Sequence, residues 1–495
     1  MLRRPKRQLI SAAIVTFWCV MMAALFYREG SLPFLGSKPA SLPTRVLRPS
    51  STWMGVYSGE TRVGFVNINT TPDTRDGHIG VAFSSTARLH LNLLATPLDL
   101  FISGVAWIPQ DGGKAEFDFK VRSGEHTMRV SATVANGLLD AQILTGGEAI
   151  PFQFPVGKDL LLSGVMGTTT LNVPLLRVGE EVVIDAFDPM TFSVGKARVK
   201  CVGEETIEAA GASVRTKIVE TSTNGLTSKA WIDDNEEIVR AETPLGFTLR
   251  RISPQEALAP AGETPPSDLL RTVAVRPEGM KPFRGAKRMT VRVSGVPETN
   301  YPPVDDVQTA NGAEYTIASP PEPLDMPSGG PLDETLKASL AGDAFIQSEH
   351  PRVKGLAGKI VGDEKDPWRQ AKRIYDWVHE NIRKTVVLSV PSALETLETR
   401  EGDCNEHAVL FAALARAAGI PTRVAIGLAW SDDLDGFYYH AWPEVHVGRW
   451  IPMDPTLGQP IADATHVKLL NGNIETWPQL LPYIGQLRMD IVSIE

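Results

Sequence analysis

Alternation of apolar and polar side chains runs through much of the first half of the chain. Between residues 115 and 121 every second residue is apolar, a Ser-Gly-Glu turn follows, and the alternation returns between 128 and 134. Because successive side chains of a β-strand point to opposite faces, this period of two predicts strands with one buried face. The same pattern occurs at residues 63–68, 79–83, 89–93, 214–219 and 229–232.

Turn-forming pairs separate these segments. Asp76-Gly77, Asp111-Gly112 and Asn224-Gly225 are residue types that tolerate the left-handed backbone of a tight hairpin. Many short strands joined by hairpins predict an antiparallel β domain over residues 51–270, curved or partly closed. This stretch contains no recognisable catalytic set, so we interpret it as a scaffold that also contributes to substrate recognition.

Two connecting segments and a helical region complete the pattern. Residues 31–50 have the composition of a linker, and residues 271–330 form a proline-rich connector with one short β segment near 289–293. After Asp366-Pro367, an N-cap followed by proline in the first turn, apolar residues at helical spacing predict an amphipathic helix at 368–383. Its apolar stripe is typical of core packing. We place a second domain at residues 331–495.

The N-terminus has the pattern of a membrane anchor. Four basic residues precede an uncharged run at 8–27, and residues 9–27 span about 28 Å as a helix, enough to cross a bilayer core. We predict an anchor at 1–30 in a single-pass membrane protein. Its N-terminus is cytoplasmic and its bulk periplasmic or extracellular. A cleaved signal peptide is the main alternative, although Ala23-Ala24-Leu25 is a poor cleavage site. A buried soluble helix fits this charge pattern less well.

Composition narrows the functional classes. The 495 residues carry 22% charged side chains and a net charge of −9, without a basic run beyond the first residues, which argues against nucleic-acid binding. Three scattered cysteines are too few for a disulfide framework or a zinc cluster. Residues 431–436 partly resemble a calcium loop, but Trp442 stands where the bidentate glutamate belongs. We expect no metal and no cofactor.

Cys404 has the setting of a nucleophile. It precedes a run of strong helix formers at 405–418, which Gly419 ends. Asp403 and Glu406 have the spacing of a capping box, so Cys404 is expected in the first helical turn. The helix dipole there favours a thiolate, and the N–H of Cys404 is a candidate oxyanion donor. The alternative is a buried, inert thiol.

His440 and Asp454 are candidate partners of this thiol. Residues 423–430, 437–447 and 450–453 are predicted strands, with a turn at Asp435-Gly436. Antiparallel pairing places His440 beside Asp454, where the carboxylate can fix the imidazole tautomer. His407 is a poor rival base because it shares a helix with Cys404, and His446 lacks a neighbouring aspartate.

These segments resemble the core of the transglutaminase-like superfamily, in its bacterial, papain-like branch. The resemblance covers about a quarter to a third of the chain. It implies an α+β catalytic core with Cys404 as nucleophile, His440 as base and Asp454 as orienting acid. One departure is Pro443, which has no N–H where the family pattern usually has one. The matching words are Arg-Glu-Gly-Asp-Cys-Asn-Glu-His-Ala at 400–408, Arg-Ala-Ala-Gly-Ile-Pro-Thr-Arg-Val at 416–424, Tyr-His-Ala-Trp-Pro-Glu-Val at 439–445 and Trp-Ile-Pro-Met-Asp-Pro-Thr at 450–456, and the tail at 464–469 also fits.

The functional expectation is thiol acyl transfer on amide or peptide bonds of a protein or peptide substrate. Animal-type cross-linking members carry two further β domains after the core, whereas about 40 residues follow Asp454 here. We therefore expect a cysteine protease or amidase, a hydrolase, in preference to a cross-linking acyltransferase. One alternative is a catalytically silent binding or assembly module of the cell envelope. Another is a peptidoglycan amidase.

Overall fold

The computed structural model divides the chain into residues 1–45 and 46–495, and the description below concerns the second unit. The described residues are 49–495, apart from 94–95, 111–112, 125, 146–147, 158–159, 163–175, 189–192, 224–225, 245, 261–273, 324–332, 388–389, 473–475, 477–478 and 481. The predicted anchor at 1–30, nearly all of the linker, and the turns at 111–112 and 224–225 lie outside them. Among the described residues, no helix is both long and apolar enough to cross a bilayer.

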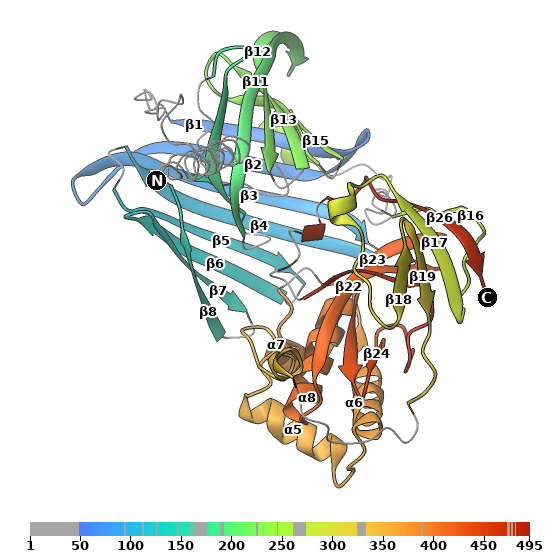
Figure 1. Ribbon diagram of the computed structural model, residues 1–495. Coiled ribbons are helices and arrows are strands. Elements are labelled where there is room, and N and C mark those ends of the chain that lie inside the picture. The colour runs from blue at the N-terminus through green and yellow to red at the C-terminus, as the bar shows by residue number, and fades with distance from the viewer. Residues whose placement is uncertain are drawn as a thin grey trace, which may run out of the picture. The chain divides into compact units, whose positions relative to one another are not determined.

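A 15-stranded sheet occupies the first half of the described chain (Figure 1). Its order is β8 to β1 in reverse sequence, then β15 to β9, so that β1 pairs with β15 and joins two meanders. Neighbouring strands are antiparallel except β9 and β10, which are parallel. The strands are β1 (Ser50–Ser58), β2 (Thr61–Arg75), β3 (His78–Leu93), β4 (Thr96–Pro109), β5 (Ala115–Ser123), β6 (His126–Ala135), β7 (Leu138–Thr145), β8 (Glu148–Pro155), β9 (Leu160–Leu162), β10 (Glu181–Asp188), β11 (Ser193–Ala209), β12 (Ala212–Thr223), β13 (Leu226–Asp233), β14 (Ile238–Glu242) and β15 (Phe247–Arg251).

The alternation in the sequence identifies the buried face of this sheet. On β5 and β6 the side chains of Phe117, Val121, Val130 and Ala132 are buried in one core cluster, as the period of two predicts. The prediction of short strands was wrong for β3, because residues 79–83 and 89–93 belong to one strand of 16 residues. The polar middle of β3 stays extended because β2 and β4 pair with it on both sides.

A second sheet has five strands in the order β16-β26-β17-β19-β18. The proline-rich connector supplies four of them, so its β content is larger than the one short segment that we expected. Its fifth strand comes from the end of the chain, and β26 pairs antiparallel with β17. The strands are β16 (Glu278–Gly279), β17 (Arg288–Ser294), β18 (Gln308–Asn311), β19 (Glu314–Ala318) and β26 (Arg488–Ile494), with the short 3-10 helix η1 (Glu298–Asn300) between β17 and β18.

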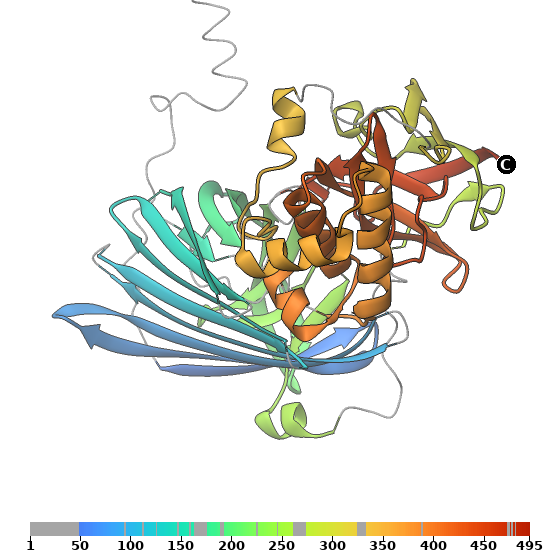
Figure 2. The ribbon, with the colours of Figure 1, turned by 90° about the horizontal axis from the view of Figure 1, so that it is seen from below.

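A third sheet, of four strands, carries the segments that resemble a thiol enzyme. Its order is β24-β23-β22-β25, and the helices α5, α6 and α8 share one apolar core with it. Figure 2 shows these helices, in orange, gathered together. The elements are α5 (Pro351–Val361), α6 (Pro367–Asn381), α7 (Ala393–Thr399), α8 (Cys404–Ala417), β22 (Thr422–Ser431), β23 (Gly436–His446), β24 (Trp450–Pro452) and β25 (His466–Asn471); shorter pieces are α2 (Pro254–Leu258), α4 (Glu334–Ala338), β20 (Arg383–Lys384) and β21 (Glu401–Gly402).

The helices predicted at residues 368–383 and 405–418 are confirmed as α6 and α8. The stripe on α6 is buried at Ala371, Ile374, Tyr375 and Val378, which accounts for the helical spacing of these residues. Packing also links this part of the chain to the large sheet, because Phe345 and Val390 lie in the same apolar cluster as the β5–β8 side chains. The segments next to these helices and the large sheet thus share buried surface.

Candidate thiol site

Cys404 is the first residue of α8, as the sequence predicts. The Asp403 carboxylate accepts the Asn405 N–H at 2.8 Å, and the Glu406 carboxylate accepts the Asp403 N–H at 2.9 Å, which completes the capping box. Neither of these bonds uses the N–H of Cys404. The cap therefore fixes the start of the helix and the position of the sulfur, while the donor of Cys404 stays out of the capping box.

The ionisation of Cys404 differs from the prediction. Burial, followed by the nearby carboxylate of Asp403, raises the pKa of the thiol well above its ordinary value, and Glu406 and Asp454 act in the same direction. A hydrogen bond from the Ala441 N–H to the sulfur opposes them. The expected effect of the helix dipole is thus outweighed by desolvation and by negative charge. A thiol with a raised pKa needs a base before it can act as a nucleophile.

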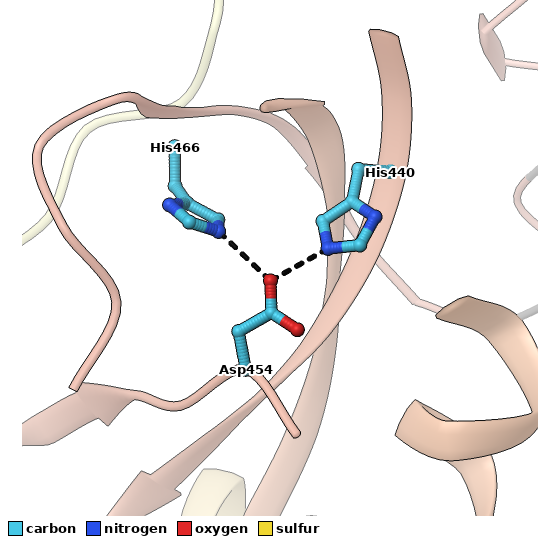
Figure 3. A group of neighbouring side chains, drawn as sticks. All are labelled: His440, Asp454 and His466. Atoms are coloured by element: carbon cyan, nitrogen blue, oxygen red, sulfur yellow. Dashed lines mark hydrogen bonds and ion pairs between the residues drawn. The ribbon is translucent and has the colours of Figure 1, made fainter. Parts of the chain in front are cut away.

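His440 and Asp454 meet as the strand order predicts. The Nε2 atom of His440 lies 2.7 Å from Oδ2 of Asp454, and both side chains are buried (Figure 3). A carboxylate accepts hydrogen bonds, so Nε2 carries the proton of a neutral ring. Nδ1 is then the proton-accepting nitrogen, and it points away from Asp454 (Figure 3). His440 directly precedes Ala441, whose N–H bonds the sulfur of Cys404, so the backbone of β23 next to His440 runs beside the thiol.

Two backbone features shape the sheet around this pair. His440 pairs with Gly427 across β23 and β22, and a Cβ on Gly427 would lie 2.1 Å from the carbonyl oxygen of Val467. Only glycine allows β22 and β25 to approach so closely here. Pro443 does not break β23, because it pairs with Val424 and its carbonyl accepts the Met453 N–H at 2.9 Å. That bond extends the pairing of β23 beyond β24, just before Asp454.

His466 and Asp463 were missed as members of the site. His466 Nε2 lies 3.0 Å from the same Asp454 Oδ2 that binds His440, and its Nδ1 faces the carbonyl and carboxylate oxygens of Asp463 at 3.2 and 3.3 Å. These neighbours raise the pKa of His466 to about 9 although burial opposes the shift. A histidine close after Asp454, with an aspartate three residues before it, was the available signal.

The two rival bases lie in other settings. His407 is buried, its Nδ1 lies 2.7 Å from the carbonyl oxygen of Asp403, and burial lowers its pKa. His446 is partly buried and packs edge-on against Trp450, with ring centroids 5.2 Å apart. Neither forms a hydrogen bond with Asp454 in the described part of the chain. His440 is the histidine that the structure pairs with the predicted aspartate.

His440, Asp454 and His466 also have the residue types of a metal site. Their potential ligand atoms all lie within 4.8 Å of one another. Both nitrogens, however, are at hydrogen-bonding distance from one carboxylate oxygen. As N–H groups they already satisfy it, so the trio is explained by hydrogen bonding alone.

A second buried polar cluster, which we call the Lys468 cluster, lies on the same face of the sheet. It consists of Lys468, Glu444, Arg423 and Asp305. The ammonium of Lys468 lies 2.9 Å from Glu444 and also pairs with Asp305, while Arg423 contacts Glu444 at 2.6 Å and Asp305 at 2.9 Å. Two positive and two negative charges balance within it. Asp305 comes from the connector, so the cluster also ties that segment to the catalytic sheet.

Trp442 lies on β23 between His440 and Glu444. It is buried, stacked near His440 with centroids 6.1 Å apart and edge-on to His466 at 5.1 Å. Its indole N–H has no hydrogen-bond partner within the described residues. Trp442 thus packs within the core of this site, and its indole N–H makes no described hydrogen bond.

A groove on the large sheet lies away from these residues. A groove of about 690 Å³ crosses strands β2 to β8 and is lined by residues between 69 and 151. None of the three predicted site residues lines it. We take the chemistry of residue types as the better guide to the reactive site, because a groove on an open sheet face needs no catalytic role.

Comparisons with known proteins give partial matches. Over 81 residues, 15% of this chain, the sequence is 36% identical to an uncharacterized protein of Haemophilus influenzae, and the match spans 22% of that protein's length. Three solved structures show similarity with low TM-scores, on which no conclusion rests. A candidate cysteine protease of Cytophaga hutchinsonii scores 0.27 at 17% identity, covering 45% of this chain and 86% of its own. A β-barrel-like protein of unknown function from Brucella abortus scores 0.30 at 9% identity, with 41% and 95% coverage. A candidate protease of Parabacteroides distasonis scores 0.20 at 14% identity, with 68% and 69% coverage.

The family model is the decisive comparison. Residues 354–455 match the transglutaminase-like superfamily, and this range contains Cys404, His440 and Asp454. The chain therefore carries a domain of the transglutaminase-like superfamily.

Proposed function

We propose that this protein is a thiol acyl-transfer enzyme that cleaves amide or peptide bonds with Cys404, His440 and Asp454. The observation that carries the proposal is the hydrogen bond between His440 Nε2 and Asp454, 2.7 Å long and buried. It fixes the tautomer whose Nδ1 accepts a proton, on a residue adjacent to the N–H that binds the sulfur of Cys404.

The reaction proceeds through a thioester. His440 Nδ1 takes the thiol proton as the sulfur attacks the carbonyl carbon, and the oxyanion accepts the N–H of Cys404. Collapse of the tetrahedral intermediate breaks the C–N bond, and the imidazolium gives its proton to the leaving amine. A water molecule then loses a proton to His440 and attacks the thioester, which releases the acid and restores the thiol. Asp454 stabilises the imidazolium at each stage.

Water is the acceptor that we propose, with a protein or peptide as substrate. The large sheet is the proposed recognition surface, since its groove on β2 to β8 offers hydroxyl, amide and carboxylate groups to an extended chain. We also propose that the N-terminal segment anchors the enzyme outside the cytoplasm. Alkaline phosphatase and green fluorescent protein fusions at residue 50 test this: export predicts phosphatase activity without fluorescence, and the reverse pattern rejects it.

A silent binding or assembly module is the second candidate. It is favoured by the raised pKa of the Cys404 thiol, because a partly buried thiol that keeps its proton is a poor nucleophile without help. Labelling with iodoacetamide across pH discriminates the two. A thiol coupled to His440 changes its pH profile when His440 is replaced by Gln, whereas an isolated thiol keeps the same profile.

Mass spectrometry of casein incubated with the protein tests the reaction itself. Hydrolysis adds the mass of one water at each cut, deamidation changes the mass by about one unit, and added primary amine is incorporated only if the enzyme accepts amines. Cys404→Ala and His440→Gln should abolish every such change. Isolated cell walls form a parallel arm, in which release of stem peptides identifies an envelope amidase. Products that persist in both variants reject the proposal.

A further inference from the structure

Both ring nitrogens of His466 face hydrogen-bond acceptors. Its side chain is 3% exposed; Nε2 faces Asp454 Oδ2 at 3.0 Å, and Nδ1 faces the carbonyl and carboxylate oxygens of Asp463 at 3.2 and 3.3 Å. Carbonyl and carboxylate oxygens cannot donate, so both ring nitrogens must carry protons to satisfy these contacts. The geometry therefore assigns a positively charged imidazolium. The pKa of about 9 agrees with this assignment.

The second carboxylate of this contact is itself held in place. Asp463 accepts N–H bonds from Gly285 at 2.8 Å, from the Gln459 side chain at 2.7 Å and from the Thr465 backbone at 2.9 Å. Its pKa lies below the ordinary value, because the bonds and charge of His466 outweigh burial. A fixed, ionised Asp463 keeps His466 charged and oriented.

Asp454 therefore serves two rings with one oxygen atom. Oδ2 accepts from His440 and from His466, whose ring centroids lie 5.9 Å apart (Figure 3). The charges of Asp454, Asp463 and His466 sum to −1 while His440 is neutral. Without the positive ring the same group of residues would carry −2, and a proton on His440 would be stabilised further.

We propose that His466 is a positioning residue that acts through its charge: it offsets Asp454 and so keeps the proton shared by Cys404 and His440 on the sulfur in the resting enzyme. This inference rests on the proposed function of the Cys404–His440 pair. The positive ring lies against His440, with ring centroids 5.9 Å apart, so it disfavours a proton on that imidazole. The raised pKa of Cys404 fits a resting thiol.

Alkylation by iodoacetamide tests the proposal on the full-length protein without a known substrate. The rate is measured from pH 5 to 9 for the Cys404 peptide by mass spectrometry, in the wild type and in His466→Gln and His466→Asn. The Gln side chain keeps an N–H donor toward Asp454, and the Asn side chain keeps one toward Asp463. Neither side chain carries the positive charge of His466. We expect Cys404 in both variants to be alkylated about three- to tenfold faster than in the wild type near pH 6. The reason is the lost Coulomb repulsion between the charge of His466 and a proton on His440. Rates equal to or slower than wild type would overturn the proposal.

Two controls separate the possible failures. Cys201 is buried, so faster labelling of its peptide reports unfolding in the same digest. His440→Gln tests the thiol site itself: an unchanged profile there rejects the proposed function, whereas a changed profile with an inert His466→Gln rejects only the role of His466. Nitrogen-15 NMR of the wild type gives an independent readout at pH 7. Two protonated ring nitrogens on His466 are expected, and a neutral ring contradicts the inference even if the variants do not fold.

Discussion

Two buried polar clusters on one face of the β22–β25 sheet differ in whether their charges balance. In the Lys468 cluster, Lys468 and Arg423 pair with Asp305 and Glu444, and the charges sum to zero. In the cluster around Asp454, one imidazolium faces two carboxylates, and balance is reached only when His440 takes a proton. In the first cluster every charged group has a partner of opposite charge. The second has room for one more proton, which is what a general base requires.

The largest effect should come from removing the thiol of Cys404, the proposed nucleophile. Cys404→Ala is expected to lower peptide or amide cleavage by at least about 10³-fold, because no other group can form the thioester. The measurement is product formation from casein by mass spectrometry. Cys201→Ala is the matched control, since Cys201 is buried in the large sheet and should leave the rate unchanged. Equal loss in both variants would point to unfolding and not to chemistry.

Breaking the balanced cluster should cost stability and leave the chemistry in place. Lys468→Met leaves Glu444 and Asp305 with Arg423 as their remaining positive partner, so we expect a loss of about 3–5 kcal/mol in the free energy of unfolding. Urea denaturation measures it. Lys281→Met is the control, because Lys281 pairs with Asp435 at the exposed surface and no measurable change is expected there. Similar midpoints for both variants would show that the Lys468 cluster contributes little.

The unbalanced cluster predicts a pH dependence of stability. His466 has a pKa raised to about 9 from 6.5, so its contribution is fully present below about pH 6.5 and is lost as pH rises through 9. The shift corresponds to about 2–4 kcal/mol. The lowered pKa values of Asp454 and Asp463 act on the acid side, where stability falls as pH drops below about 4.

Urea denaturation between pH 6 and 9.5 checks the alkaline part. His466→Gln should be less stable than wild type at pH 6 and should approach it near pH 9.5. Parallel curves for the two proteins would mean that His466 is neutral in the folded state.

The contrast between the clusters also explains what the sequence predicted and what it did not. Cys404, His440 and Asp454 were predicted because helix capping and strand pairing are local, and the structure brings His440 to Asp454 through those local rules. His466 was missed because its contact with Asp454 depends on the close approach of β25 to β22 at Gly427, which nothing local specifies.

Tertiary environment overrode local physics in two further places. The helix dipole predicted a thiolate at Cys404, but burial and Asp403 dominate there. Residues 84–88 lack a clear strand pattern, yet two neighbouring strands hold them in β3. The sheet of the connector was underestimated for the same reason, since β26, which pairs with β17, lies at the other end of the sequence.

The smallest expected effect concerns Trp442, which separates the two clusters on β23. Its indole N–H is buried without a partner among the described residues, so deleting that donor removes a desolvation cost while the smaller ring loses some packing. Trp442→Phe should therefore change the free energy of unfolding by less than about 1 kcal/mol, as urea denaturation can measure. Trp442→Ala is the comparison, with an expected loss of about 3–5 kcal/mol from the cavity. A large loss in the Phe variant would mean that the indole N–H does bind something, and the boundary between the clusters would then itself be a polar site.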